Sequence, residues 1–279
     1  NGSEFTAPAS DGLTRPEGNT DSYFQWLGSD GKLYAPGDSV PADVIKLTAQ
    51  FDEQFTLTPG GVYYFDLSDV SIPGTANGSL PDKTMHYVPF TYAGTVDAYK
   101  LTSEMATTEE YAQQNEYAHS LFVADYAVTH AVSWDNLNAE GLIFGKGYAT
   151  GSVDYTLRAP SGGSGGTGSG ALERGTPQSN EWDRILDKDD GYIKNWRNIG
   201  SWGQDTLPNT LSNRVIRGRY DLPRKYAGAN TTLSFPFLGF RPVLEVLNPG
   251  TLGSDGLKAV TLDLGGGKLG GSSDTIQII

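Results

Sequence analysis

The side chains best suited to chemistry lie in residues 219–237, and that chemistry is binding. Arginine and aromatic side chains are interspersed there with small polar ones. Arg, Tyr and Phe supply large contact areas at interfaces, while Asn, Thr and Ser supply adaptable hydrogen bonds. We therefore predict a ligand-binding face. Its predicted residues are Arg197, Asn198, Arg219, Tyr220, Asp221, Leu222, Arg224, Tyr226, Asn230, Thr232, Leu233, Phe235 and Phe237.

Two patterned runs flank this segment. Residues 213–218 and 238–246 predict β-strands, whereas the segment between them shows no helical or strand period. Rigid strands that bracket an irregular loop commonly present a binding surface. An alternative places Phe235 and Phe237 in the core of the last hairpin, because their spacing alternates, and buries Tyr226 as well. We expect a scaffold role for Trp196, Trp202, Arg217 and Arg241.

Catalytic and metal-binding patterns are weak in this sequence. The chain has no cysteine, so thiolate catalysis and Cys-ligated zinc are excluded. His86, His119 and His130 lack zinc-site spacing, and no phosphate-binding loop or nucleophile elbow occurs. Residues 187–191 faintly resemble a calcium loop, but Asn198 stands where a closing Glu is needed, which favours a solvated turn. We expect no catalytic residue, no metal and no cofactor.

Composition limits the class of protein and its partners. The chain carries 33 acidic and 20 basic residues, a net charge of −13, which argues against nucleic acid and anionic membranes as partners. No apolar run approaches the roughly 18 residues of a membrane-spanning helix, so we expect no direct membrane insertion. The 36 glycines, 15 prolines and 15 tyrosines indicate a chain rich in strands and turns.

Several elements must position the binding face. Strands are predicted at residues 3–6, 22–26, 45–51, 62–67, 85–92, 258–264 and 275–279. Ser133 is a candidate N-cap for one helix, residues 179–187 predict a second, and residues 108–116 fit either a helix or a loop. Residues 161–170 consist of glycine, serine and threonine. We expect them to form an exposed, mobile loop whose partial deletion leaves stability nearly unchanged.

The two chain ends carry complementary patterns. A glycine-rich turn at residues 264–267 follows one strand, and the N-terminal end carries TRPEG at 14–18, FQW at 24–26 and LYAPGD at 33–38. Read from the C-terminal end into the N-terminal end, this order resembles the β-grasp-like repeat of bacterial surface proteins, the Listeria–Bacteroides or internalin-type repeat. The resemblance implies that residues 1–51 and 250–279 are halves of such repeats. The strand at 258–264 would then pair with strands of residues 1–51, in one chain or between neighbouring copies. The alternative is that these are ordinary strands and turns.

Five short motifs follow one another in the middle of the chain, residues 52–249: VSW at 132–134, YTLRAP at 155–160, NEWD at 180–183, RVIRG at 214–218 and GFR at 239–241. Their order resembles the C-type lectin fold in its formylglycine-generating-enzyme-like branch. The resemblance implies an α+β protein, with a C-type lectin-like domain beside the small β-grasp-like repeat. The enzymes of this branch need a cysteine pair that this chain lacks, so their activity does not carry over.

The same branch includes the variable receptors of diversity-generating retroelements, whose last hairpins and loops are randomised at Asn codons. Residues 219–237 stand where that variable region stands, directly before GFRP at 239–242. Only Lys225 among them is of a type that such randomisation excludes. The resemblance implies a bacterial or phage-encoded receptor or adhesin, displayed at the cell surface, whose diversified face binds a protein or glycan on another cell or host surface. The alternatives are a structural stalk without a dedicated ligand and a degenerate enzyme of the formylglycine-generating type.

Overall fold

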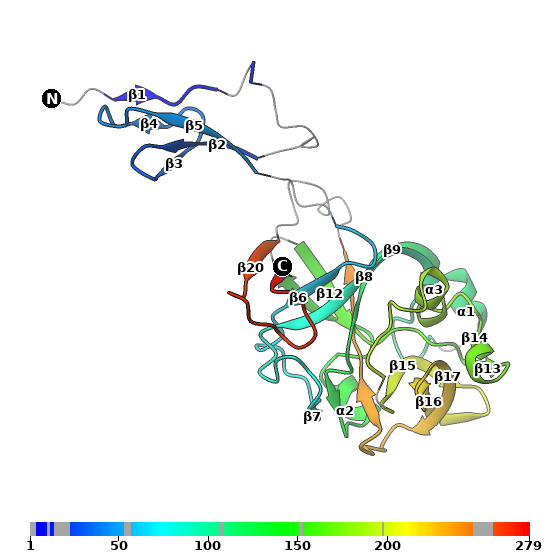
Figure 1. The fold of residues 1–279 in the computed structure, drawn as a ribbon. Helices are drawn as coiled ribbons and strands as arrows, with labels where there is room; N and C mark the ends of the chain where they lie inside the picture. Colours follow the sequence, from blue (N-terminus) through cyan, green and yellow to red (C-terminus); the bar gives the residue numbers. More distant parts are fainter. Residues whose placement is uncertain are drawn as a thin grey trace. The chain divides into compact units, whose positions relative to one another are not determined.

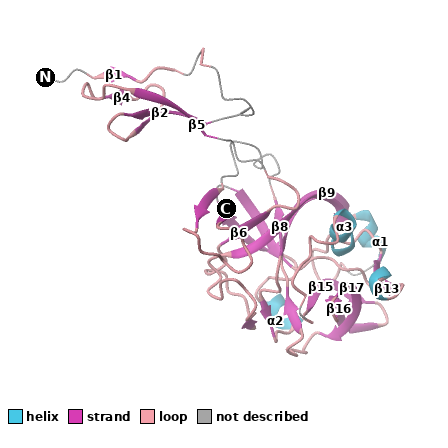
Figure 2. Cartoon of the chain, in the orientation of Figure 1, coloured by secondary structure: helices cyan, strands magenta, loops and turns pink. Residues whose placement is uncertain are grey.

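The computed structural model describes residues 4–9, 12–13, 23–52, 57–106, 109–150, 153–196, 198–247 and 259–279. The chain divides into two compact units, Asn1–Thr56 and Leu57–Ile279. The fold is mostly β, with 43% strand and 9% helix, and its sheets are mixed (Figure 1). Figure 2 shows how short the helices are beside the strands. The expected α+β class is therefore too rich in helix, because few windows of this glycine-rich chain sustain more than two helical turns.

The described part of the first unit consists of short strands. β1 (Phe5–Thr6) pairs with β4 (Ser39–Val40), and β2 (Tyr23–Gly28) lies between β3 (Leu33–Tyr34) and β5 (Leu47–Asp52). The small core contains Ala7, Tyr34, Val40 and Val44, with Trp26 and Leu47 packed against it. The strands predicted at residues 22–26 and 45–51 are thus confirmed. The TRPEG motif at 14–18 lies outside the described residues.

An eight-stranded sheet forms the larger layer of the second unit, in the order β11-β12-β19-β9-β8-β6-β21-β20. Its strands are β6 (Val62–Phe65), β8 (Val88–Tyr99), β9 (Glu116–Ala124), β11 (Lys146–Thr150), β12 (Val153–Arg158), β19 (Val243–Val246), β20 (Val260–Asp263) and β21 (Thr275–Ile278). Most residues of β8 and all of β19 are buried, so both faces of the sheet centre are covered. The predicted strands at 62–67 and 85–92 lie here.

A six-stranded sheet carries the segment predicted to bind, in the order β17-β16-β15-β18-β10-β7. Its strands are β7 (Thr75–Ala76), β10 (Thr129–His130), β15 (Gly200–Leu207), β16 (Thr210–Arg219), β17 (Leu222–Asn230) and β18 (Leu238–Phe240). β15 and β18 run parallel, while β16 pairs antiparallel with β15 and β17. β17 and β7 are the two edge strands of this sheet. A separate pair joins β13 (Gly165–Thr167) to β14 (Arg174–Thr176).

The α-helices begin where the sequence predicts. Ser133 caps α2 (Trp134–Ala139) by accepting a hydrogen bond from the Asn136 amide, and Asn180 caps α3 (Glu181–Lys188) in the same way. α1 (Glu109–Gln114) resolves the ambiguous polar segment as a helix, and a 3₁₀ turn, η1 (Gly170–Leu172), follows β13. No helix in the described ranges is long and apolar enough to cross a membrane.

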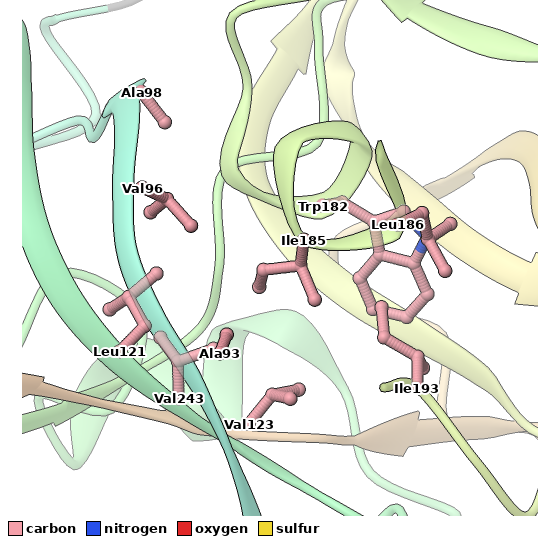
Figure 3. Packing of buried hydrophobic residues seen from close by; sticks show 10 residues of the cluster. All are labelled: Ala93, Val96, Ala98, Leu121, Val123, Trp182, Ile185, Leu186, Ile193 and Val243. Atoms are coloured by element: carbon pink, nitrogen blue, oxygen red, sulfur yellow. The ribbon is translucent and has the colours of Figure 1, made fainter. Parts of the chain in front are cut away.

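A hydrophobic cluster joins α3 to the eight-stranded sheet. Figure 3 shows α3 side chains facing side chains of β8 and β9. The cluster contains Ala93, Val96, Ala98, Leu121, Val123, Trp182, Ile185, Leu186, Ile193 and Val243. Burying such side chains contributes about 1.5–3 kcal/mol each, so this contact fixes α3 on the sheet. The helix also contacts the six-stranded sheet, because Asp183 of α3 accepts from Arg217 of β16 at 2.6 Å.

A buried charge network lies beside this cluster. The Arg158 guanidinium donates to Glu181 at 2.6 and 2.8 Å and to Glu245 at 2.8 and 3.1 Å. Glu245 also accepts from Lys100 at 2.8 Å, and His119 Nε2 lies 2.7 Å from Glu181. Burial alone would raise the pKa of Glu181, but Arg158 and His119 lower it to about 2. Each buried carboxylate therefore has a positively charged partner. Removing one partner would leave a buried charge uncompensated.

The C-terminal hairpin adds two strands to the eight-stranded sheet. β20 pairs antiparallel with β21, as the strand–turn–strand pattern predicts, but β21 then pairs in parallel with β6 through Ile278 and Tyr64. Within the second unit the partner of β20 is β21, and the pairing of the strand at 258–264 with strands of residues 1–51, in one chain or between copies, stays a prediction. The parallel contact with β6 forms because buried Ile276 and Ile279 continue the apolar side of a large sheet. A two-stranded fragment alone could not bury them.

The structure of the glycine-rich stretch, residues 161–170, differs from the exposed loop that the sequence predicts. Residues 161–164 are buried rather than exposed, and residues 165–167 form strand β13. The Ser161 hydroxyl donates to the Tyr99 carbonyl oxygen at 2.6 Å, and the Gly162 amide donates to Asp205 at 2.7 Å. Only residues 166–169 are exposed. The expectation of an exposed loop failed because the Ser161 hydroxyl and the backbone of these residues have hydrogen-bond partners inside the unit.

Candidate functional site

The hairpin β16–β17 carries the first half of the predicted binding segment. Residues 219–237 were expected to lack strand structure, yet Leu222–Asn230 forms the edge strand β17. Its turn consists of Tyr220 and Asp221, with φ angles of 57° and 59°, and Arg219 pairs with Leu222 across it. Two consecutive positive φ angles are what a two-residue type I′ hairpin turn requires, although Gly and Asn are its usual residues. A tyrosine is an uncommon residue in this conformation, because its Cβ is crowded there.

Four side chains gather at this turn and the loop before β18. We call Arg219, Tyr220, Phe235 and Phe237 the aromatic patch. The Arg219 guanidinium lies over the Phe237 ring, 3.9 Å from its centroid, and over the Tyr220 ring at 4.6 Å. The rings of Phe235 and Phe237 stack with centroids 5.2 Å apart. A cation between rings orders all four side chains without a ligand.

The aromatic patch faces solvent. Tyr220 is 58% exposed and Phe235 is 47% exposed, while Arg219 and Phe237 are half-buried. The alternative that Phe235 and Phe237 are core residues is therefore wrong. Exposed aromatic clusters of this kind mark interaction surfaces more often than isolated exposed residues do. The patch combines the residue types that anchor interfaces with a rigid arrangement.

A tight backbone contact fixes the base of the patch. The Gly200 amide donates to the Phe237 carbonyl oxygen at 2.8 Å, and Gly200 pairs with Leu238 in the parallel β15–β18 contact. A Cβ at Gly200 would lie 2.4 Å from Cγ2 of Ile216, so only glycine fits there. The Leu238 amide also donates to the Phe235 carbonyl oxygen at 2.8 Å, which closes the turn that presents both phenylalanines.

The second predicted patch lies in the segment before Gly200. Asn198 is exposed and has a φ angle of 60°. Arg197 lies outside the described residues. Trp196 is half-buried: its ring contacts Trp182 at 5.8 Å between centroids, and the guanidinium of buried Arg241 lies over it at 5.1 Å. The predicted scaffold role of Trp202, Arg217 and Arg241 agrees with their complete burial.

Arg224 and Tyr226 are half-buried and have partners within the chain, where exposed side chains were expected. The Arg224 side chain is 11% exposed and pairs with Asp190 at 2.9 Å and Asp187 at 3.5 Å. The Tyr226 hydroxyl donates to the Gly163 carbonyl oxygen at 3.1 Å. Burial, together with Asp205, raises its pKa well above the usual value. The two side chains lie on one face of β17, where Tyr226 contacts the glycine-rich stretch and Arg224 contacts the acidic residues at the end of α3.

The remaining predicted residues divide between turn and strand. Asp221 is exposed beside Tyr220, and Leu222 is half-buried at the start of β17. Asn230 Oδ1 accepts from the Thr232 amide at 3.1 Å and from its hydroxyl at 2.8 Å, so these two shape the turn after β17. Leu233 is half-buried in that turn. These residues surround the patch or shape the loop that leads to it.

Arg217 is the residue that ties this region to the rest of the unit. Its guanidinium donates to Asp183 of α3 at 2.6 Å and to the Gly162 carbonyl oxygen at 2.8 Å. It also lies 5.7 Å from the Tyr226 ring centroid. Sequence reasoning placed Arg217 in the scaffold but gave it no partner. The available signal was the N-cap pattern Asn180-Glu181-Trp182-Asp183, whose acidic residue at the third helical position is buried.

The acidic side chains near α3 have partners within the chain. Among the described residues no group of three or more His, Asp or Glu side chains is arranged to hold a metal ion. In the sequence that faintly resembles a calcium loop, Asp187 pairs with Arg174 at 2.6 Å and Asp190 with Arg224. Asp189 accepts from the Gly191 amide at 2.7 Å. These carboxylates already have partners, which supports the simpler interpretation as a turn.

Comparison with models of protein families, with curated proteins and with solved structures found no match for this chain.

Proposed function

We propose that the second unit is a ligand-binding module of a surface-displayed receptor or adhesin, and that the aromatic patch is the centre of its binding face. The observation that carries this proposal is the exposed stack in which the Arg219 guanidinium lies over the Tyr220 and Phe237 rings. Ordered side chains lose little entropy when a partner binds, so they supply affinity efficiently. The ligand is a protein or glycan presented by another surface.

The resemblance to C-type lectin variable receptors belongs to the same proposal. In that scheme the strands and α3 form a constant scaffold, and diversification acts on the exposed turns. The burial pattern narrows the positions that can vary freely. Arg219, Tyr220, Asp221, Phe235 and Phe237 can change without disturbing a buried partner, whereas Arg224 and Tyr226 cannot. This sets the proposal apart from a stalk without a ligand, for which no such division is expected.

Two experiments test the proposal. The first sequences related gene copies in one genome. Differences concentrated at Arg219, Tyr220, Asp221, Phe235 and Phe237 support a diversified face, and differences scattered over the second unit contradict it. The second measures binding of the purified, labelled chain to a glycan array and to a panel of bacterial cells.

The binding experiment compares two double variants. Tyr220→Ser with Phe235→Ser removes the patch, and Met105→Ser with Leu211→Ser removes two exposed apolar side chains elsewhere. We expect the first pair to weaken binding about tenfold or more, since interface aromatics contribute about 2 kcal/mol or more, and the second pair to leave it unchanged. Equal binding by both pairs would remove the patch from the binding face.

A further inference from the structure

A cavity of about 570 Å³ lies in the second unit, between the C-terminal hairpin and the end of the β6–β8 pair. Its wall includes residues from β6, β21, the segment after β9 and the segment after α3. None of the predicted binding residues lines it. Ligand pockets for single small molecules are typically of about 300–1,000 Å³, so the volume suits one or two sugar-sized rings.

Two opposite charges line the cavity around a shared hydroxyl. The Thr91 hydroxyl donates to Asp125 Oδ1 at 2.5 Å and lies 3.3 Å from Lys194 Nζ, which donates to it. Asp125 is 6% exposed. Its second carboxylate oxygen accepts no hydrogen bond from the residues that the structure describes, and the ammonium of Lys194 uses one of its three donors. The wall therefore offers a strong acceptor and strong donors with unused capacity.

Buried Arg241 holds the two segments that carry these charges. Its guanidinium donates to the Ala124 carbonyl oxygen at 2.7 Å, next to Asp125, and to the Asn195 carbonyl oxygen at 3.3 Å, next to Lys194. The side-chain nitrogen Nδ2 of Asn195 donates to the Asp125 backbone carbonyl oxygen at 3.3 Å. Both charges thus stand on backbone that is cross-linked by hydrogen bonds. A site preorganised in this way loses little on binding.

The rest of the wall is neutral and of two kinds. Polar groups come from Tyr64, Ser272, Ser273 and Gln277. The Ser272 hydroxyl donates to the Ser273 carbonyl oxygen at 2.8 Å, the Ser273 hydroxyl to the Thr275 carbonyl oxygen at 2.7 Å, and the Gln277 side-chain amide to Thr261 at 2.7 Å, so these side chains offer a ligand mainly oxygen atoms that accept. Apolar surface comes from Val62, Pro81, Pro89 and Ile276. One carboxylate and one ammonium leave the wall without net charge, so it favours neither a cation nor an anion. A neutral molecule with alternating hydroxyl and C–H surfaces matches it, because each hydroxyl both donates and accepts.

We propose that this cavity binds a neutral carbohydrate, with adjacent sugar hydroxyls donating to Asp125 and accepting from Lys194. The apolar side of the wall receives the C–H face of the ring. The site is independent of the aromatic patch, so the second unit has two separate binding surfaces. A free amino acid also carries a donor and an acceptor, but its full charges would leave the many neutral groups of the wall without a role.

The test follows methyl resonances of the full chain by NMR. Glucose, galactose, mannose, fucose and N-acetylglucosamine are titrated separately to tens of millimolar, with glycine and alanine as zwitterionic probes. Ile276 reports from the cavity wall and Ile185 from the α3 cluster. We expect at least one sugar to shift the Ile276 methyl resonance saturably and to leave Ile185 unchanged.

Variants separate the cavity from the patch and from the fold. Asp125→Asn and Lys194→Met should each weaken the sugar about tenfold or more, since each removes a charge-assisted hydrogen bond. Asp154→Asn and Lys188→Met, at exposed positions, are the matched controls and should bind as the parent chain does, as should Tyr220→Ala. Lys194 is partly exposed, so its variant keeps the test valid if Asp125→Asn fails to fold. The proposal is overturned if no sugar shifts Ile276, if only the amino acids do, or if both cavity variants bind normally.

Discussion

Residues 161–164 and residues 235–237 both lie outside the strands and helices predicted from the sequence, but they occupy opposite environments. The first segment, which has no side chain larger than serine, is buried, whereas the second exposes a phenylalanine. In the buried segment, backbone groups contact Asp205, Arg217 and Tyr226. The difference shows that burial here follows from partners for the backbone. It does not follow from apolar side chains alone.

The two segments are also mechanically linked. Arg217 of β16 donates to the Gly162 carbonyl oxygen of the buried segment. Two residues further along the same strand lies Arg219 of the aromatic patch. The hydroxyl of Tyr226 in β17 donates to the Gly163 carbonyl oxygen. The buried segment therefore serves as the platform of the exposed one. Changes in the platform should act on stability, and changes in the patch should act on binding.

The largest effect is expected for Arg217→Met. This change leaves the fully buried Asp183 carboxylate with only the Asn180 and Gly175 nitrogens, at 2.7 Å each, and Arg224 at 4.0 Å. Breaking a buried ion pair by removing one partner costs about 3–5 kcal/mol. Urea unfolding should therefore show a free energy of unfolding lower by that amount.

A double variant shows whether the loss of unfolding free energy comes from the unpaired Asp183 carboxylate. Arg217→Met combined with Asp183→Asn should lose less than the sum of the two single variants, because no carboxylate is then left unpaired. A loss below about 1 kcal/mol for Arg217→Met alone would mean that the platform does not depend on this pair.

The next effect concerns Gly163, at the centre of the platform. Its φ angle is 88°, and a Cβ there would lie 2.7 Å from the Cα of Gly175 and the amide nitrogen of Thr176. Gly163→Ala should lower the free energy of unfolding by about 2–3 kcal/mol through backbone strain and overlap. Gly165→Ala is the matched control, because its Cβ would meet no atom within 4 Å. It should stay within about 0.5 kcal/mol of the parent.

Local patterns made much of the fold predictable. Ser133 was identified as a cap because its hydroxyl needs only the next turn of backbone, and α3 followed from the polar residues before Trp182. The strands before and after residues 219–237 followed from alternation. Such signals depend on neighbours in sequence, so one sequence suffices to find them.

Long-range contacts were out of reach. Tyr226 pairs with Gly163, 63 positions away, and nothing local in either segment indicates this contact. β17 was missed because as an edge strand its residues are evenly half-buried and show no alternation. The contact of the C-terminal hairpin with Tyr64 was out of reach for the same reason, because it joins distant parts of the chain. In the candidate site, the residue types were predictable, and their division into platform and patch was not.

A smaller effect depends on pH. Asp205 is buried beneath the platform, accepting from the Tyr99 hydroxyl at 2.5 Å and the Gly162 amide at 2.7 Å. Burial raises its pKa, and these hydrogen bonds only partly oppose the shift. The folded state therefore holds the proton more tightly than the unfolded chain, whose aspartates titrate near about 3.9. Its contribution to stability is full below that pH and is lost as the pH rises through the folded pKa.

Asp205→Asn should remove that part of the pH dependence. The parent chain should show a component of the unfolding free energy that falls with rising pH by up to about 1.4 kcal/mol per unit, and the variant should lack it. Asp97→Asn, at an exposed position of β8, is the matched control and should keep the component. Identical pH profiles for the parent and Asp205→Asn would show that this carboxylate does not set the pH response of the platform.

The smallest effect lies in the patch and has the opposite sign. Tyr220 sits at a φ angle of 57°, a conformation that costs a bulky residue about 1–2 kcal/mol and that Asn adopts more readily. Tyr220→Asn loses the contact with Arg219, worth about 0.5–1 kcal/mol at an exposed site, so a net gain of about 0.5 kcal/mol in unfolding free energy is expected. Ligand binding should weaken at the same time. A stabilised variant that binds less well would show that strain is held in this turn for recognition, as is common at binding surfaces. If Tyr220→Asn instead destabilised the chain, the tyrosine would belong to the scaffold, and the division between platform and patch would have to be redrawn at the hairpin turn.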